Sequence, residues 1–213
     1  MPDLSILFHD YWTVLVAYVV GATPFGFLAG KAKGIDIREH GSGNIGATNV
    51  LRVLGKPVGI TVLVLDVMKG LVPVIIAKLV SDSSLVQIAT AMAAILGHNY
   101  TFWLGFKGGK GIATTGGAIL PIMPWALIAA VLGWIIVLKI SRYVSLASIA
   151  AALIIPLTLV VENLITGTWE WNIFGFGMFV CLLAIWKHRS NIRRLIRGEE
   201  NRFAKKTSSR KTP

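Results

Sequence analysis

Cysteine and charge are the two features that this chain of 213 residues has least of. Its single cysteine, Cys181, lies inside an apolar run, which excludes an internal disulfide and a cysteine-based metal cluster. Charged residues make up 15% of the chain, against about 25% in soluble globular proteins. Apolar residues reach 54% and the mean hydropathy is +0.69, so the composition indicates an integral membrane protein with little chain left for a separate soluble domain.

Seven apolar runs predict an all-α integral membrane protein with seven transmembrane helices, some of them short. The runs fall at about 11–30, 56–79, 84–97, 111–121, 124–139, 143–161 and 171–187. The run 111–121 would span only ~16 Å as a helix, and Pro121 and Pro124 follow it, which predicts a short helix, a tight break and another helix. We expect residues 1–203 to form one membrane domain and residues 204–213 a basic, disordered cytoplasmic tail.

Basic residues alternate from loop to loop. The segments 31–52, 100–110, 139–142 and 187–213 hold 18 of the 21 Lys and Arg, whereas 1–10, 81–84, 121–124 and 162–170 hold none. By the positive-inside rule, this alternation places the N-terminus outside and the C-terminus in the cytoplasm, with Lys78 as the one cation that it leaves unexplained. The net charge of +11 does not indicate nucleic-acid binding, because no basic stretch is interleaved with aromatic residues that could stack on bases.

The first basic loop carries a glycine-rich segment, His40–Arg52. It contains a formal G-x-G-x-x-G, but no strand precedes it and no βαβ unit surrounds it, which excludes a dinucleotide-binding fold. Glycines and small polar residues just before a predicted helix would expose backbone N–H groups to an anion. The candidate substrate-binding residues are Gly41, Ser42, Gly43, Asn44, Thr48, Asn49 and Arg52. A flexible membrane loop is the alternative, although flexibility alone requires neither asparagine nor arginine.

A second glycine-rich segment, Gly105–Gly111, precedes the half-length helix. It is not a P-loop, because Gly111 follows Lys110 where Ser or Thr should stand. Lys110 with Gly108 and Gly109 would combine fixed positive charge, free N–H groups and the positive end of a helix dipole. Two lysines that merely reach the membrane surface are the alternative interpretation.

Two further groups of polar residues lie at the same predicted membrane face. Arg142, Ser145 and Ser148 are spaced to share one helix face, and His188 and Asn191 form an i, i+3 pair after the last apolar run. Asp66 and Lys69 lie one turn apart inside the second run, where we expect them to neutralise each other. No carboxylate cluster and no metal-ligand spacing accompanies these residues, so we expect no metal. The combination suits small phosphate-bearing anions.

Four segments in this order resemble the motifs of the bacterial acyl-phosphate:glycerol-3-phosphate acyltransferases, the PlsY family: Gly41–Asn49, Phe106–Gly111, Tyr143–Ser148 and Lys187–Leu195. The resemblance runs from about residue 11 to Phe203. It implies an enzyme of the bacterial cytoplasmic (inner) membrane, with its active site facing the cytoplasm. The implied reaction transfers an acyl group from acyl phosphate to glycerol 3-phosphate, giving 1-acyl-glycerol 3-phosphate (lysophosphatidic acid) and inorganic phosphate, the first acylation of phospholipid synthesis.

The resemblance also implies roles and partners. Its catalytic residues fall on Ser42, Lys110, His188 and Asn191, and its phosphate-hole and substrate residues include Arg52 and Ser148. It implies no cofactor. The implied partners are the two substrates, the lipid bilayer and a cytosolic enzyme that produces acyl phosphate.

The histidines favour acyl phosphate over acyl-CoA as the donor. Acyltransferases that use acyl-CoA resemble one another in an H-x-x-x-x-D motif, but the fifth residues after the four histidines are Val14, Ile45, Trp103 and Arg193. His188 stands among cationic residues with no carboxylate close in sequence, which makes it a poor general base. We therefore expect His188 and Asn191 to position glycerol 3-phosphate, and the departing phosphate to accept the proton.

A phosphate or organophosphate transporter is the alternative function, since it would also use a broken helix and cationic anion sites. The run 111–121 has no equally interrupted partner in an inverted repeat, and the predicted outside loops contain no cation that would attract a substrate. The sequence therefore favours the enzyme.

Overall fold

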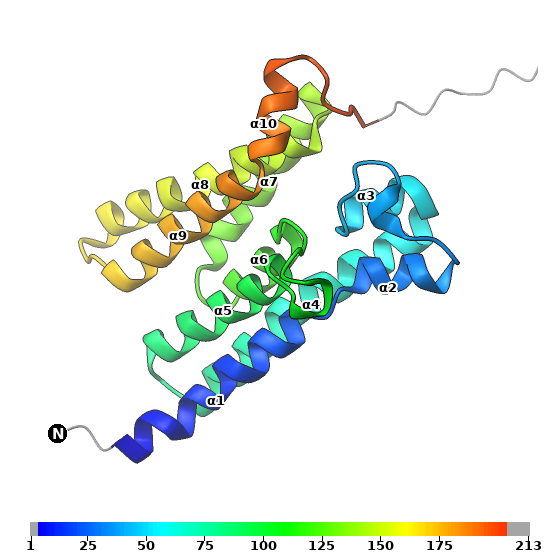
Figure 1. Cartoon of the computed structure of the whole chain (residues 1–213). Helices are drawn as coiled ribbons and strands as arrows, with labels where there is room; N and C mark the ends of the chain where they lie inside the picture. Colours follow the sequence, from blue (N-terminus) through cyan, green and yellow to red (C-terminus); the bar gives the residue numbers. More distant parts are fainter. Residues whose placement is uncertain (1–3, 204–213) are drawn as a thin grey trace, which may run out of the picture.

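The computed structural model describes residues 4–203, with side chains from residue 11 onward, and the regular secondary structure of these residues is all helical (Figure 1). The α-helices are α1 (Leu4–Gly21), α2 (Phe25–Ala32), α3 (Ala47–Leu54), α4 (Lys56–Val80), α5 (Ser84–Asn99), α6 (Ile112–Ile119), α7 (Pro124–Ser141), α8 (Val144–Thr166), α9 (Trp171–Lys187) and α10 (Arg189–Ile196). Two 3-10 helices are η1 (Ile37–Glu39) and η2 (Phe102–Leu104). The tail predicted at 204–213 lies outside the described residues.

Each of the seven apolar runs contains helix, but fewer than seven segments are long and apolar enough to cross a bilayer. Four pass that test within the described part of the chain: Tyr11–Ala32, α4, α7 and α8. A fifth is added if α9 and α10, which are bent by 56°, count as one span. Helices α5 and α6 have only 16 and 8 residues. The all-α membrane architecture is thus confirmed, while seven crossings and the sidedness of the termini stay predictions.

The first apolar run is broken rather than continuous. Helix α1 ends at Gly21 and α2 begins at Phe25, because Pro24 has no N–H with which to continue the helical bonds. The carbonyls freed at the break accept hydrogen bonds from distant side chains, Ala22 from Thr101 Oγ1 (2.5 Å) and Thr23 from Lys69 Nζ (2.8 Å). Such replacement partners are what allow a helix to break at membrane depth.

The short helix predicted after the second glycine-rich segment is present as α6, and the chain breaks before α7 starts at Pro124. Its backbone lies directly against α4. A Cβ atom added at Gly70 would lie 2.1 Å from the Thr114 carbonyl oxygen, and one at Gly117 would lie 2.0 Å from the Val67 carbonyl oxygen. Glycine on both helices therefore permits the close approach of α6 to α4.

The helices pack as two groups that meet along α5 and α9. Helices α1, α4, α5 and α6 form one group and α7, α8 and α9 the other (Figure 1). A shared apolar core that includes Ile95, Ile119, Ile155 and Val180 joins them. Helices α3 and α10 lie at the end of the molecule away from the start of α1.

Two intramembrane cations that the sequence singled out have specific partners. Lys69 Nζ lies 2.8 Å from Asp66 Oδ1, which confirms the expected neutralisation. Lys78 Nζ donates to the carbonyl oxygen of Pro121 (2.7 Å), a group freed by the break between α6 and α7. The structure thus gives Lys78 a role that the charge pattern alone did not.

Candidate functional site

A cavity of about 410 Å³ lies between the two helix groups. Its lining comes from α3, α4 and α6 on one side and from α7, α8 and α9 on the other. Its cations and hydrogen-bonding groups come mainly from both glycine-rich segments and from the segment that follows α9, and Lys110 bonds Asn191 across the site. The rest is lined by apolar side chains: Leu63, Val67, Ile112, Ile119, Leu127, Val131, Val144, Ile155 and Val180.

The cavity brings together most of the residues that the sequence predicted. Ten line it, from four separate segments: Ser42, Asn44, Thr48, Asn49, Arg52, Lys110, Ser145, Ser148, His188 and Asn191. Five predicted substrate-binding residues do not: Gly41, Gly43, Gly108, Gly109 and Arg142.

The first glycine-rich segment is closed by the buried side chain of Asn49. Asn49 Oδ1 accepts from the Ser42 N–H (2.8 Å), and Asn49 Nδ2 donates to the carbonyl oxygens of Ile37 (3.3 Å) and His40 (3.0 Å). Gly41 has a φ of 62°, and a Cβ there would lie 2.3 Å from Asn49 Oδ1. The Ser42 N–H is therefore used inside the loop, and Gly41 serves the shape of the loop while Ser42 and Asn49 face the cavity.

The second glycine-rich segment rests on the end of α5. The Gly108 N–H donates to the Asn99 carbonyl oxygen (3.2 Å) and the Gly109 N–H to that of His98 (3.1 Å). The sequence predicted free N–H groups here, but both are bonded within the protein. A Cβ at Gly108 would lie 2.0 Å from the His98 carbonyl oxygen. These glycines permit a close backbone approach, and Lys110 is left as the cavity-facing member of the segment.

Lys110 is a cation of the cavity whose pKa is changed by its surroundings. Its Nζ donates to Asn191 Oδ1. The pKa of Lys110 is lowered from 10.5 to about 8, chiefly by burial; Glu200 opposes this lowering, and the positive charges of Arg194, Arg52 and Lys187 add to it. Lys110 is thus a charged donor near neutral pH that can lose its charge in mildly alkaline solution.

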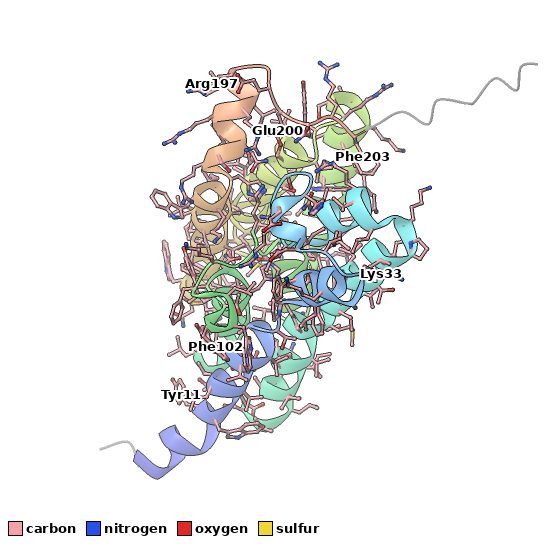
Figure 2. The ribbon with its side chains drawn as sticks, turned by 45° about the vertical axis from the view of Figure 1, so that its right-hand side comes forward. Tyr11, Lys33, Phe102, Arg197, Glu200 and Phe203 are labelled. Atoms are coloured by element: carbon pink, nitrogen blue, oxygen red, sulfur yellow. The ribbon has the colours of Figure 1, made fainter. Side chains whose placement is uncertain are left out.

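Glu200 is a site residue that the sequence reasoning missed. Its Oε1 accepts from Asn191 Nδ2 (2.7 Å) and Ser145 Oγ (2.8 Å), and its Oε2 accepts from Arg194 Nε (2.7 Å). Burial alone would raise the pKa of Glu200, but these hydrogen bonds outweigh it and lower the pKa. Figure 2 shows Glu200 at the end of the molecule that also carries Arg197 and Phe203. A sequence signal existed, since Glu199 and Glu200 are the only acidic residues in the basic segment 187–213.

His188 is 2% exposed and follows the last residue of α9. Its Nδ1 lies 2.8 Å from the carbonyl oxygen of Ala184, which can only accept, so Nδ1 carries a proton and Nε2 is the acceptor in the neutral ring. Within residues 4–203, no ion pair joins His188 to a carboxylate. The ring is held in one orientation by the backbone and not by a carboxylate, as it would be in a triad.

The predicted helix face that joins Arg142 to Ser145 and Ser148 is wrong. Arg142 has a φ of 62° and ends α7, and α8 begins only at Val144, so Arg142 belongs to neither helix face. Ser145 and Ser148 do share a face of α8 and both line the cavity. Ser148 Oγ accepts from Trp134 Nε1 (3.2 Å), a second lining residue that the sequence analysis did not select. His98 and Asn201 are further lining residues of this kind, and Asp66, which the sequence singled out only as the partner of Lys69, also lines the cavity.

Comparisons with known proteins find relatives that cover most of this chain. The family model for glycerol-3-phosphate acyltransferase matches residues 11–198. A glycerol-3-phosphate acyltransferase of Desulforamulus reducens is 45% identical over 194 residues, 91% of this chain and 94% of the relative. One of Geobacter sulfurreducens is 47% identical over 189 residues, 88% and 94% of the two chains. The crystal structure of PlsY, an integral membrane glycerol 3-phosphate acyltransferase, in its glycerol 3-phosphate form has a TM-score of 0.86 and 41% identity, covering 92% of this chain and 96% of that one. Its lysophosphatidic acid form has a TM-score of 0.83 and 40% identity over the same shares.

Proposed function

This chain belongs to the glycerol-3-phosphate acyltransferase family, and we propose that it transfers an acyl group from acyl phosphate to glycerol 3-phosphate. The products are lysophosphatidic acid and inorganic phosphate, and the reaction begins phospholipid synthesis. Membership confirms the resemblance read from the four sequence motifs. The donor, the products and the roles of individual residues are the proposal.

One observation carries the proposal: the same cavity is lined by cations, by hydrogen-bonding side chains and by many apolar side chains. Arg52 and Lys110 supply the positive charge that two phosphate-bearing substrates require. The apolar lining suits the chain of an acyl donor, whose transfer out of water contributes about 0.8 kcal/mol per CH₂ group. Structures of PlsY in forms with glycerol 3-phosphate and with lysophosphatidic acid support the same pair of ligand classes.

Lys110 is proposed to stabilise the departing phosphate. As the substrate hydroxyl attacks the acyl carbon, negative charge gathers on the carbonyl oxygen and on the phosphate that leaves. The Lys110 ammonium is held by Asn191, which is in turn held by Glu200, so the donor is oriented before the reaction starts. A preorganised donor of this kind is worth about 10²–10³ in rate.

The proton of the attacking hydroxyl is proposed to go to the donor's own phosphate. The new bond joins the hydroxyl oxygen to the acyl carbon, the bond from that carbon to the phosphate oxygen breaks, and the phosphate departs carrying the proton. His188 would accept a hydrogen bond from glycerol 3-phosphate through Nε2 and so orient it. Replacing His188 by Gln should therefore raise KM and leave substantial kcat, whereas loss of a true general base costs up to about 10⁴ in kcat.

We also propose that the basic end of the molecule faces the cytoplasm of a bacterial inner membrane, where a cytosolic enzyme would supply acyl phosphate. Single cysteines at positions 3 and 209, in a Cys181→Ser background, should then react with an impermeant label from opposite sides. Reaction of both from one side would mean an even number of crossings.

The proposal is tested with the purified protein, acyl phosphate and glycerol 3-phosphate. We expect one phosphate released for each lysophosphatidic acid formed, and both only when both substrates are present. Phosphate release that is equally fast without glycerol 3-phosphate would identify a hydrolase and overturn the proposal.

A further inference from the structure

Three ionisable side chains that the proposed reaction does not use lie together beside the cavity. Asp66 and Lys69 of α4 and His98 of α5 are only 2%, 4% and 5% exposed. Lys69 Nζ is 2.8 Å and His98 Nδ1 is 3.7 Å from the same oxygen, Asp66 Oδ1. Asp66 and His98 also line the cavity. Ionisable groups inside a membrane protein are costly to bury, which makes each one a functional candidate.

Lys69, at one end of this cluster, contacts the break between α1 and α2 in the first apolar run. Lys69 Nζ donates to the Thr23 carbonyl oxygen (2.8 Å) and lies 5.4 Å from the centre of the Phe25 ring. From this point α2 leads the chain to the loop that carries Ser42 and then to α3, which carries Arg52. Lys69 therefore holds the chain at the point from which it continues to Ser42 and Arg52.

The other end of the cluster supports the second glycine-rich segment. The His98 ring lies so close to Gly109 that an added Cβ would be 2.2 Å from His98 Nε2, and the Gly109 N–H donates to the His98 carbonyl oxygen (3.1 Å). Lys110 is the next residue along the chain. The His98 ring thus lies between Asp66, whose Oδ1 is 3.7 Å from Nδ1, and the backbone of the second glycine-rich segment, a place suited to supporting that segment.

Stability alone is a weak reason to retain such a cluster. A buried ion pair is often no more stabilising than apolar side chains of similar volume, whereas removal of one partner is costly. What the cluster does provide is a series of close approaches: Lys69 bonds Thr23 and pairs with Asp66, Asp66 Oδ1 lies 3.7 Å from His98 Nδ1, and the His98 ring packs against Gly109. These contacts link the segment that carries Arg52 to the segment that carries Lys110, and in the proposed function both cations bind phosphate.

We propose that Asp66 and His98 are positioning residues that hold Lys110 at a set place relative to Ser42 and to Arg52 of α3. The inference rests on the proposed function, because it gives Asp66 and His98 a role only through the placement of a phosphate-binding cation. Neither residue touches the reacting atoms in this role.

The test compares the single variant Asp66→Asn with the double variant Asp66→Asn/Lys69→Met. The single variant leaves the Lys69 charge buried without its partner and should lose stability; the double variant removes that charge and should regain most of the melting temperature. We expect kcat to stay low in both, by about 10²-fold, because misplacement by about 1 Å costs that much. His98→Gln, which leaves no charge unpaired, should behave like the double variant and serves if the others do not fold.

A second measurement separates positioning from mere structural support. A displaced Lys110 would be better hydrated, so the alkaline limb of kcat/KM should move above the wild-type value near pH 8. The charged groups that also act on Lys110 are Glu200, Arg194, Arg52 and Lys187, and none of them is altered in these variants. Thr90→Val is the matched control. Thr90 is a fully buried polar residue of α5 that hydrogen-bonds to Val86 and Thr13, so its replacement should lower stability without changing kcat or the alkaline limb.

The outcomes are distinct. A double variant and a His98→Gln variant that keep kcat within about threefold of wild type, well short of a misplacement effect, and keep the alkaline limb unmoved overturn the positioning role. A wild-type protein that releases no phosphate from the two substrates overturns the proposed function itself.

Discussion

Raising the pH above about 8 should inactivate this protein by removing the proton from Lys110. The pKa of Lys110 is lowered from 10.5 to about 8, chiefly by burial. The charged form is the one that stabilises phosphate, so activity is present below this pKa and is lost as the pH rises through it. A group with such a pKa is about nine-tenths protonated at pH 7 and about one-tenth at pH 9. We therefore expect kcat/KM to fall about tenfold between these values.

The size of the effect of removing Lys110 follows from its charge. A unit charge about 4 Å from a developing charge contributes about 4 kcal/mol at an effective dielectric constant near 20. That agrees with a loss of about 10²–10³ in rate for one preorganised donor. Lys110→Ala should lose this much. Lys107→Ala should lose little, because Lys107 is exposed and lies outside the cavity lining.

The assay is phosphate release at limiting substrate, since kcat/KM reports the pKa values of the free protein. Spontaneous hydrolysis of acyl phosphate is subtracted at each pH. Lys110→Arg provides the decisive comparison, because a guanidinium keeps its charge across the whole range. If this variant is active and still loses activity near pH 8, another group sets the limb and the assignment to Lys110 is refuted.

Three further substitutions have outcomes set by the structure. Gly109→Ala places a Cβ 2.2 Å from His98 Nε2 and should cost about 1–3 kcal/mol in thermal unfolding, as overpacking does; an unchanged melting temperature contradicts this packing. Asn49→Ala removes three hydrogen bonds worth about 1 kcal/mol each, so both stability and turnover should fall, and a wild-type melting curve would count against Asn49 as the closure of the loop. Glu200→Gln removes the anion that opposes the lowering of the Lys110 pKa, so the alkaline limb should move to lower pH, and movement to higher pH would contradict the electrostatics of the site.

Much of the fold follows from local sequence, because runs of apolar residues and prolines act over one helix. The short helix α6 and the start of α7 at Pro124 were predictable in this way. The break at Pro24 was not, since the side chains that satisfy its carbonyls, Lys69 and Thr101, come from distant parts of the chain. A proline can be read locally as a breaker, but whether a buried break is tolerated depends on such partners.

In the candidate site too, local sequence predicted some residues, and contacts between distant parts of the chain determined the others. Residue type and spacing were enough to select Lys110 and His188, because few side chains bind phosphate as cations or titrate near neutral pH. The bonds of the glycine N–H groups were not predictable, because the same glycines could face an anion or a neighbouring helix end. Glu200 was missed because its partners Ser145 and Asn191 meet it only through the packing of α8, α10 and the segment after α10.

The identity of the acyl donor is tested most directly by offering the purified protein acyl phosphate or acyl-CoA of the same chain length, at equal concentration, with glycerol 3-phosphate. Arg52 and Lys110 in a cavity with many apolar side chains suit a donor whose leaving group is phosphate. Within residues 4–203, His188 has no carboxylate partner that would help it to deprotonate the hydroxyl attacking a thioester. We predict rapid formation of lysophosphatidic acid from acyl phosphate and negligible formation from acyl-CoA. Comparable rates with the two donors would contradict the proposed reaction.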